Sequence, residues 1–300
     1  MSSVATSSLP AISRRKILAA VDLSAQSLEV LDEARRRAEQ SGGSWAVCHV
    51  LPDEVASAAP ETERVSREAL QRLVEKAAPQ GSPRLFFERG GPAASIVRAA
   101  QAWGADLIVT ASHNRSALQR VLLGSVAAGV VRYAHCAVLV VRGEAAPGRC
   151  VLAASDLSER SLPAIQAAAD EATRLGLPLS VAHAIDASWV AFNAYTSAML
   201  SAVGPSAPLV PEGPQREAAR TALAGAIENL GVSATAVVLD GPPADAIVDW
   251  ASAERAALVV IGTHGRTGLS RVLLGSVAES VVTRAPCSVE VVRLQEGMPR

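Results

Sequence analysis

The sequence predicts an α/β protein built from two tandem, doubly wound domains, each with a five-stranded parallel sheet. Three observations lead to this prediction. The chain of 300 residues repeats itself once, apolar segments of strand length alternate with longer segments of helical periodicity, and glycine or proline separates many of them. Such alternation is typical of a parallel sheet covered by helices on both faces, and a repeat of domain length indicates two copies of one fold.

The repeat is visible in two pairs of segments. KILAAVDLSAQS, from Lys16, matches CVLAASDLSERS, from Cys150, and the segment from Ser112 matches the segment from Thr263 through VLLGSVA. The offset grows from 134 to 151 residues, so the second copy carries about 17 extra residues in its first half. The predicted organisation is a disordered tail at 1–13, a first domain at 14–143, a linker at 144–148 and a second domain at 149–294.

Composition limits the functions that the chain can have. Hydrophobic residues make up 49% of the chain but aromatic residues only 3%, which predicts an aliphatic core. The net charge of −1 provides no field that would favour nucleic acid or a membrane surface. No apolar run reaches the roughly 18 residues that cross a bilayer, and the N-terminus lacks the apolar region of a signal peptide. We therefore expect a cytoplasmic protein that binds neither nucleic acid nor membrane.

The four cysteines and five histidines show no metal-ligand spacing. Cys48, Cys136, Cys150 and Cys287 lie in or beside apolar runs without a CxxC motif, so we expect buried, reduced thiols. A metal site made only of protein ligands is not expected.

Each copy begins with a strand, at 17–21 or 151–155. An aspartate, Asp22 or Asp156, follows this strand directly, and a helix comes next. Ser24 and Ser158 are the predicted N-caps, because a side-chain oxygen there accepts hydrogen bonds from free backbone N–H groups. Leu28, Leu31, Ala34 and Ala38 predict the buried face of the first helix. The helices are predicted to end at Ser-Gly-Gly and Leu-Gly, which are typical C-caps.

The remaining elements follow in the same order in both copies. Four further strands and the intervening helices are predicted from apolar runs and periodicity. The expected strands are 45–50, 85–88, 106–110 and 137–141 in the first copy, and 179–184, 234–239, 258–261 and 288–292 in the second; the expected helices include 61–77 and 215–230, and a further helix begins at each G-x-P, from Gly90 and Gly241.

Ligands of doubly wound sheets bind outside the carboxyl ends of the strands, where the winding reverses. Two features lie at such ends here: the Asp after the first strand and the glycine loop after the fourth. We expect them to meet if these two strands are neighbours. The sequence contains no G-x-x-x-x-G-K-[ST], no G-x-G-x-x-G after the first strand and no G-x-S-x-G. Residues 41–44, Ser-Gly-Gly-Ser, follow a helix and fit a C-cap better than a phosphate loop.

What remains is the motif Gly262-x2-Gly265-x9-Gly275-Ser276, together with Asp156 after the first strand of the second copy. The combination resembles the universal stress protein family, whose ATP-binding signature has this form. The resemblance covers nearly the whole chain as two fused family domains. It implies an adenine nucleotide alpha hydrolase-like fold, and it implies that the fifth strands pair, so that the copies form an internal pseudo-dimer.

The resemblance also implies roles for the second copy. Asp156 would accept hydrogen bonds from the ribose hydroxyls, and Ala184 would meet adenine through its backbone. Gly262 and Gly265 would admit the phosphates, Gly275 and Ser276 would bind them at a helix start, and Arg266 would neutralise their charge. The implied cofactor is ATP, with any Mg²⁺ held mainly by phosphate oxygens.

The first copy departs from the pattern. Asp22, Val50, Gly124 and Ser125 stand at the corresponding positions, but Ala111 and Asn114 replace the two loop glycines. Their side chains would crowd the phosphates. We therefore expect the main nucleotide site in the second copy and a structural role for the first.

No residue stands out as a general base, so the chain is expected to be a nucleotide-dependent regulatory module of a stress response. Two alternatives stay open: a slow ATPase or phosphate-transferring enzyme, and a scaffold that binds no nucleotide. A homodimer and a regulatory protein partner are further expectations. The extra segment, residues 189–214, carries an aromatic stripe that favours packing, with a lid or partner surface as the alternative.

Overall fold

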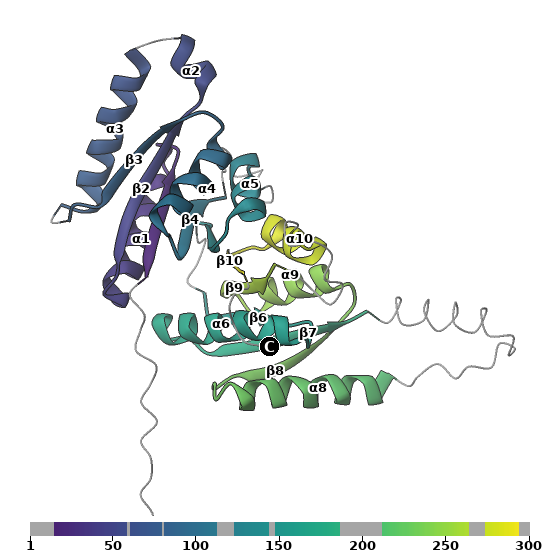
Figure 1. The fold of residues 1–300 in the computed structure, drawn as a ribbon. Coiled ribbons are helices and arrows are strands. Elements are labelled where there is room, and N and C mark those ends of the chain that lie inside the picture. Colours follow the sequence, from purple (N-terminus) through teal and green to yellow (C-terminus); the bar gives the residue numbers. More distant parts are fainter. Residues whose placement is uncertain are drawn as a thin grey trace, which may run out of the picture. The chain divides into compact units, whose positions relative to one another are not determined.

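The computed structural model describes residues 15–58, 61–79, 81–112, 123–143, 148–186, 212–263 and 274–293. The chain divides into two compact units (Figure 1). Unit 1 runs to Ala111 and includes Ala134–Cys136; unit 2 holds Ser112–Tyr133 and everything from Ala137 onward. The last helix and last strand of the first repeat therefore belong to the same compact unit as the whole second repeat.

Unit 1 contains a parallel sheet in the order β3-β2-β1-β4. Strand β1 is central, since it pairs with β2 on one side and with β4 on the other. All of its residues after Lys16 are apolar and buried, as expected of a strand in this position. The winding thus reverses between β1 and β4. The elements are β1 Lys16–Val21, α1 Ser27–Ser41, β2 Ser44–Leu51, α2 Asp53–Ala58, α3 Glu61–Ala77, β3 Arg84–Arg89, α4 Pro92–Trp103 and β4 Leu107–Ala111.

The described part of unit 2 contains six strands in the order β5-β10-β9-β6-β7-β8. The second repeat supplies five parallel strands, and β5 of the first repeat joins them. The elements are α5 Ser125–Tyr133, β5 Ala137–Val141, β6 Cys150–Ala154, the short 3₁₀ helix η2 Glu159–Ser161, α6 Leu162–Leu175, β7 Leu179–Ile185, α8 Glu212–Asn229, β8 Thr235–Asp240, α9 Pro243–Ala253, β9 Ala256–Gly262, α10 Ser276–Arg284 and β10 Ser288–Val292.

The condition for the Asp and the glycine loop to meet is fulfilled, because the first and fourth strands of each repeat are neighbours, β1 with β4 and β6 with β9. The pairing of the fifth strands, which the family resemblance implies, is confirmed. The two fifth strands, β5 and β10, pair antiparallel, with Val140 opposite Val289 and Val138 opposite Val291. This pairing satisfies the backbone groups along one edge of each strand and buries both apolar runs.

The core is aliphatic, as the composition predicts. Its largest fully buried side chains are almost all Leu, Ile and Val, including Leu31 in unit 1 and Ile165 in unit 2. All four cysteines are free and buried. Burial, with a smaller contribution from Glu88, raises the pKa of the Cys48 thiol to about 12, so this thiol stays protonated at neutral pH.

Ser158 is the N-cap of η2 as predicted, whereas α1 has Gln26 and not Ser24 as its N-cap, and neither cap residue forms a side-chain cap hydrogen bond. Helix α1 begins at Ser27, directly after Gln26, and has no side-chain cap. The preceding turn is held by Asp22 instead: its Oδ1 accepts the Ser24 backbone N–H at 2.9 Å and the Ser27 hydroxyl at 3.2 Å. Ser158 does precede η2, but its hydroxyl also donates to an aspartate, Asp156, and not to the helix. In both repeats the aspartate organises the turn.

The predicted C-caps are confirmed. Gly42 and Gly176 adopt left-handed conformations, with φ of 59° and 66°, directly after α1 and α6. Gly43 is constrained by space, because a Cβ on it would lie 2.0 Å from the backbone oxygen of Arg15. The Ser-Gly-Gly-Ser segment is therefore a helix end.

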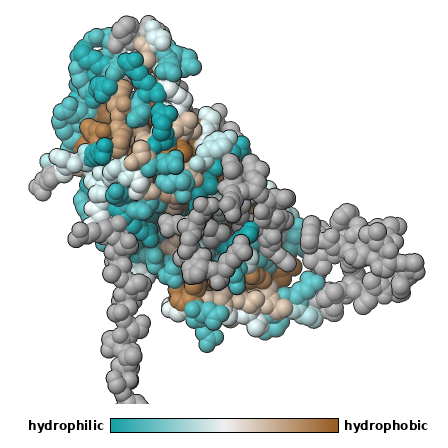
Figure 2. Space-filling view, in the orientation of Figure 1, coloured by the Kyte–Doolittle hydropathy of each residue, from teal (hydrophilic) through white to brown (hydrophobic). Residues whose placement is uncertain are grey.

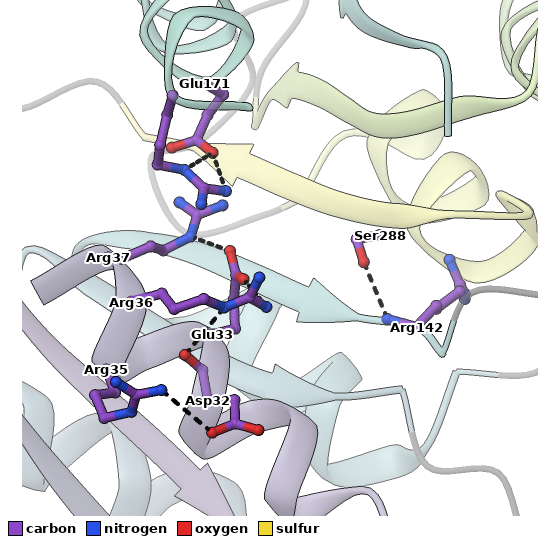
Figure 3. Close-up of polar contacts among 9 residues, drawn as sticks. Asp32, Glu33, Arg35, Arg36, Arg37, Arg142, Glu171 and Ser288 are labelled. Atoms are coloured by element: carbon purple, nitrogen blue, oxygen red, sulfur yellow. Dashed lines mark hydrogen bonds and ion pairs between the residues drawn. The ribbon is translucent and has the colours of Figure 1, made fainter. Parts of the chain in front are cut away.

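Other differences from the predicted elements are local. Helix α2 was not predicted, and α8 begins at Glu212, so Pro214 lies inside the first helical turn, where its missing N–H costs no helical hydrogen bond. Most of the extra segment, residues 189–211, lies outside the described residues. On α1 the buried face includes Arg37, which is 4% exposed and donates from Nε to Glu33 at 2.7 Å (Figure 3).

Most of the visible surface is hydrophilic (Figure 2). On unit 1, apolar residues gather around the edge strand β3, where Leu85 is 45% exposed. Among the described residues, no helix is both long enough and apolar enough to span a membrane.

Candidate functional site

The candidate site lies at the carboxyl edge of β6, β7 and β9 in unit 2. Ala154 of β6 pairs with Ala182 of β7 and with Ile261 of β9. The residues that follow these three positions emerge at the same edge of the sheet. The structure thus brings Asp156, Ala184 and Gly262 to one edge, at the point where the winding reverses.

Asp156 is the half-buried carboxylate of this edge. Its Oδ1 accepts two hydrogen bonds from Ser158, at 3.1 Å from the backbone N–H and 2.6 Å from the hydroxyl. Its Oδ2 is buried and has no hydrogen-bond partner among the described residues. A buried carboxylate oxygen without a donor is costly, so this atom is suited to accept a hydroxyl of a bound molecule.

The turn that carries Asp156 is held by a network that the sequence did not reveal. Ser155 Oγ lies 2.8 Å from Ser161 Oγ and accepts the Leu157 backbone N–H at 3.1 Å. His183 Nδ1 lies 2.9 Å from the Ser155 carbonyl oxygen. Leu157 itself has a φ of 65°, a left-handed conformation that is unfavourable for a leucine. The one available signal was the change from Val21 in the first repeat to Ser155 in the second.

The glycine loop joins the same edge through backbone contacts. Gly262 ends β9 opposite Val292 of β10. Thr263 donates its N–H to the Val292 carbonyl at 3.1 Å and accepts the Gly275 N–H at 2.8 Å. A Cβ on Gly275 would lie 3.1 Å from the Thr263 oxygen, which is tighter than ordinary contact. The start of α10 is therefore tied to the end of β9, while Gly265 and Arg266 lie outside the described residues.

Helix α10 begins at Ser276 behind Gly275, which has extended geometry and forms no side-chain cap. The first intrahelical bond runs from the Glu279 N–H to the Gly275 carbonyl at 2.9 Å. The N–H groups of the preceding turn have no acceptor within the helix. Together with the helix dipole, they form a site suited to an anion.

The corresponding residues of the first repeat are divided between the two units. Asp22 and Val50 lie in unit 1, whereas Gly124 and Ser125 lie in unit 2. Gly124 repeats the backbone contact of Gly275, donating to the Ser112 oxygen at 3.0 Å. A left-handed Leu23 comes directly after Asp22, as Leu157 does after Asp156, but Asp22 is exposed. All the described residues of the second candidate site, by contrast, belong to one compact unit.

The two strand-end histidines are structural. His49 Nδ1 lies 2.9 Å from the Val21 oxygen, the same contact that His183 makes to Ser155. Burial lowers the pKa of His49, so its ring is neutral at neutral pH and donates from Nδ1 to the carbonyl. Among the described residues, no group of three His, Cys, Asp or Glu side chains is arranged to hold a metal ion.

Known proteins share both the sequence and the fold. The chain is 30% identical to a universal stress protein of Mycolicibacterium smegmatis over 302 residues, covering 92% of this chain and 96% of that protein. It is 37% identical to a universal stress protein of Mycobacterium tuberculosis over 195 residues, and 50% identical to one of Methanocaldococcus jannaschii over 66 residues. These two alignments span 62% and 39% of the respective relatives.

Solved structures agree on the fold along the chain. A universal stress protein from Archaeoglobus fulgidus matches with a TM-score of 0.66 at 20% identity, covering 95% of this chain and 98% of that one. A Pseudomonas aeruginosa structure of the same description matches with a TM-score of 0.69 at 24% identity, covering 95% of both chains. The model of the universal stress protein family matches residues 13–142 and 149–293. The chain therefore belongs to the universal stress protein family and carries two domains of that family in tandem.

Proposed function

We propose that the second repeat binds ATP at the carboxyl edge of β6, β7 and β9. The observation that carries the proposal is the Asp156 carboxylate, with Oδ1 satisfied by Ser158 and Oδ2 buried without a partner. A carboxylate that presents one free oxygen is a suitable acceptor for the hydroxyls of a ribose. The helix start at Gly275 and Ser276, joined to the same edge through Thr263, is a suitable phosphate site.

The remaining contacts follow from the order of the strands. Ala184 lies on β7 opposite Leu239 of the edge strand β8, and we assign the adenine edge to its backbone. Gly262, at the end of β9, allows close approach of the phosphates because it has no Cβ. We assign the phosphates to the first turn of α10 and the Ser276 hydroxyl, assisted by Gly265 and Arg266. Mg²⁺, where present, would be held mainly by phosphate oxygens.

We propose one full site per chain. In the first repeat Asp22 is exposed, and its carboxylate meets both Ser24 and Ser27. Ala111 stands where the second repeat has Gly262, so a methyl group occupies the position at which the chain must approach the phosphates. The first repeat is then a structural partner of the second.

We propose that ATP acts as a regulatory ligand in a stress response and that the protein is not primarily an enzyme. The described side chains at the edge, such as Ser155, Ser158 and His183, are engaged in holding the Asp156 turn and its neighbouring strands. Bound nucleotide would stabilise one arrangement of the glycine loop and α10, which a regulatory protein partner or a second copy of the chain could recognise.

The test is to denature the purified protein after incubation with ATP and to quantify the released nucleotide by mass spectrometry. We expect one ATP per chain in the wild type and in Asp22→Ala, and none in Asp156→Ala. Two nucleotides per chain would contradict the assignment to a single repeat, and none from the wild type would support a scaffold. Conversion to ADP in proportion to protein concentration, abolished by Asp156→Ala, would instead support an ATPase.

A further inference from the structure

Two arginines, the buried Arg142 and the partly exposed Arg293, connect the repeats within unit 2. Arg142 follows β5 of the first repeat, and its Nη2 donates to the carbonyls of Val282 and Thr283, in the last turn of α10, at 2.6 and 3.0 Å. Its Nη1 donates to Cys287 O at 3.3 Å. The backbone N–H of Arg142 also donates to Ser288 Oγ at 3.1 Å (Figure 3). The C-terminal end of α10 is therefore held by a residue of the other repeat.

Arg293 makes the reciprocal contact. It follows β10 of the second repeat, and its Nη2 donates to the carbonyls of Val131 and Arg132, in the last turn of α5, at 2.6 and 2.7 Å. Each repeat thus supplies a cation to the C-terminal end of the last helix of the other. Cations at this end are favourable because helix carbonyls there lack intrahelical donors and carry the negative end of the dipole.

The charge of Arg142 is buried, and no carboxylate of the described residues pairs with it. Arg142 is 6% exposed, and its side-chain partners among the described residues are the three backbone carbonyls. Arginine remains protonated in proteins. Because solvent screening is weak at a buried position, the guanidinium charge acts strongly on the carbonyl end of α10.

A second contact from the first repeat reaches the other end of α10. Arg132 of α5 donates to Glu279, in the first turn of α10, at 2.6 Å. An unpaired carboxylate there would oppose an anion at the helix start. The ion pair offsets that charge, so the first repeat affects α10 at both ends.

We propose that Arg142 is a positioning residue for the phosphates of the nucleotide, and that the first repeat thereby sets the nucleotide affinity of the second. The inference rests on the proposed function. Helix α10 has nine residues, a length of about 13 Å, and is short enough to move as a rigid body. Fixing its last carbonyls fixes the direction of its first N–H groups, and the cation at its C-terminal end offsets the negative end of the helix dipole, which would otherwise oppose an anion.

The position of Gly275 gives this effect a route into the site. The Gly275 N–H donates to Thr263, whose own N–H donates to Val292. A rotation of α10 about its C-terminal end would lengthen the Gly275 contact and turn the first-turn N–H groups away from the phosphates. Adenine and ribose, which we assign to Ala184 and Asp156, would be unaffected.

The experiment measures ATP and adenosine binding by calorimetry in the wild type, Arg142→Lys, Arg142→Met and Arg293→Met. Since adenosine lacks phosphates, we expect Arg142→Met to weaken ATP binding about tenfold and to leave adenosine binding within about twofold. Arg142→Lys should recover part of the ATP affinity. Arg293→Met is the matched control, because it removes the equivalent cation from α5, and it should leave the ratio of the two affinities unchanged.

The outcomes separate the two proposals. If the wild type binds no ATP, the proposed function fails and this inference fails with it. If the wild type binds ATP but Arg142→Met retains the ratio of ATP to adenosine affinity, only the role of Arg142 is overturned. Equal loss of both ligands would show general damage to the fold and would also overturn it. Should Arg142→Met not fold, Arg142→Lys supplies the comparison, and an unchanged ratio there contradicts the inference.

Discussion

The Ser158 hydroxyl lies 2.6 Å from Asp156 Oδ1, and the Ser158 N–H approaches the same oxygen at 3.1 Å. Both bonds go to one oxygen of the carboxylate, so the other oxygen, Oδ2, is left buried without a partner. This arrangement orients the carboxylate before any ligand is present.

Replacing Ser158 with Ala is therefore expected to weaken ATP binding without abolishing it. The Ser158 N–H remains, but the carboxylate loses one of the two bonds that orient it, at a cost of roughly 1 kcal/mol, or about fivefold in affinity. Calorimetry with ATP measures the change. Ser27→Ala is the control, since Ser27 Oγ bonds to Asp22 at 3.2 Å in the first repeat. Equal losses in the two variants would contradict a single site in the second repeat.

Gly275→Ala is expected to reduce ATP affinity about tenfold and to lower the free energy of unfolding by roughly 1 kcal/mol. The added methyl would lie 3.1 Å from the Thr263 oxygen, so the helix start must shift away from β9. Gly225→Ala provides a control in α8, where an added Cβ has no heavy atom within 4 Å. That change should stabilise the protein by about 0.5 to 1 kcal/mol and leave ATP binding intact. Undiminished ATP binding by Gly275→Ala would argue against phosphate contact at α10.

Stability is expected to fall as the pH drops below 6.5, partly because of His49. Burial is the largest cause lowering its pKa from 6.5, so in this range the unfolded chain binds a proton that the folded chain does not. Above pH 6.5 the ring of His49 is neutral in both states, and it causes no loss of stability. Below pH 6.5 the free energy of unfolding decreases until the pH reaches the folded-state pKa of His49. Urea unfolding at pH 7.5 and 5.5 tests this against His49→Gln, which does not titrate. An identical pH dependence in the variant would rule out a contribution from His49.

Cys48 is expected to resist alkylation in the native protein at pH 8. Its pKa is raised to about 12 by burial, so almost no thiolate is present, and its side chain is inaccessible. Iodoacetamide labelling followed by mass spectrometry should modify Cys48 in urea but not under native conditions. Rapid native labelling would mean that β2 opens readily, which its central position between β1 and β3 opposes.

Several features of the fold could be predicted because they depend on local pattern. The alternation of apolar strands and helices and the glycine C-caps at Gly42 and Gly176 follow from periodicity and backbone freedom. The doubly wound sheet follows from the handedness of crossovers. The repeat also allowed the fifth strands to be matched. Asp156 and the Gly275 loop could be singled out because glycines and a strand-end carboxylate stand out against an aliphatic sequence.

The two predicted N-caps, neither of which forms a side-chain cap hydrogen bond, show where local pattern is insufficient. Ser24 and Ser158 are good cap residues by type, but in both cases an aspartate two residues earlier competes for the turn. Which acceptor prevails depends on the left-handed conformation of Leu23 and Leu157, and no residue type predicts that conformation for leucine.

The sequence by itself determined two α/β repeats, the succession of strands and helices along the chain and the residue types of a candidate nucleotide edge, because each of these is encoded in short-range spacing. Only the tertiary structure decided that Asp156 Oδ2 is buried and unpartnered, and that Arg142 and Arg293 reach across to the last helices of the opposite repeats. The arginine contacts join residues 140 or more positions apart. The burial of Asp156 likewise depends on the packing of neighbouring strands, so neither feature leaves a periodic signal in the chain.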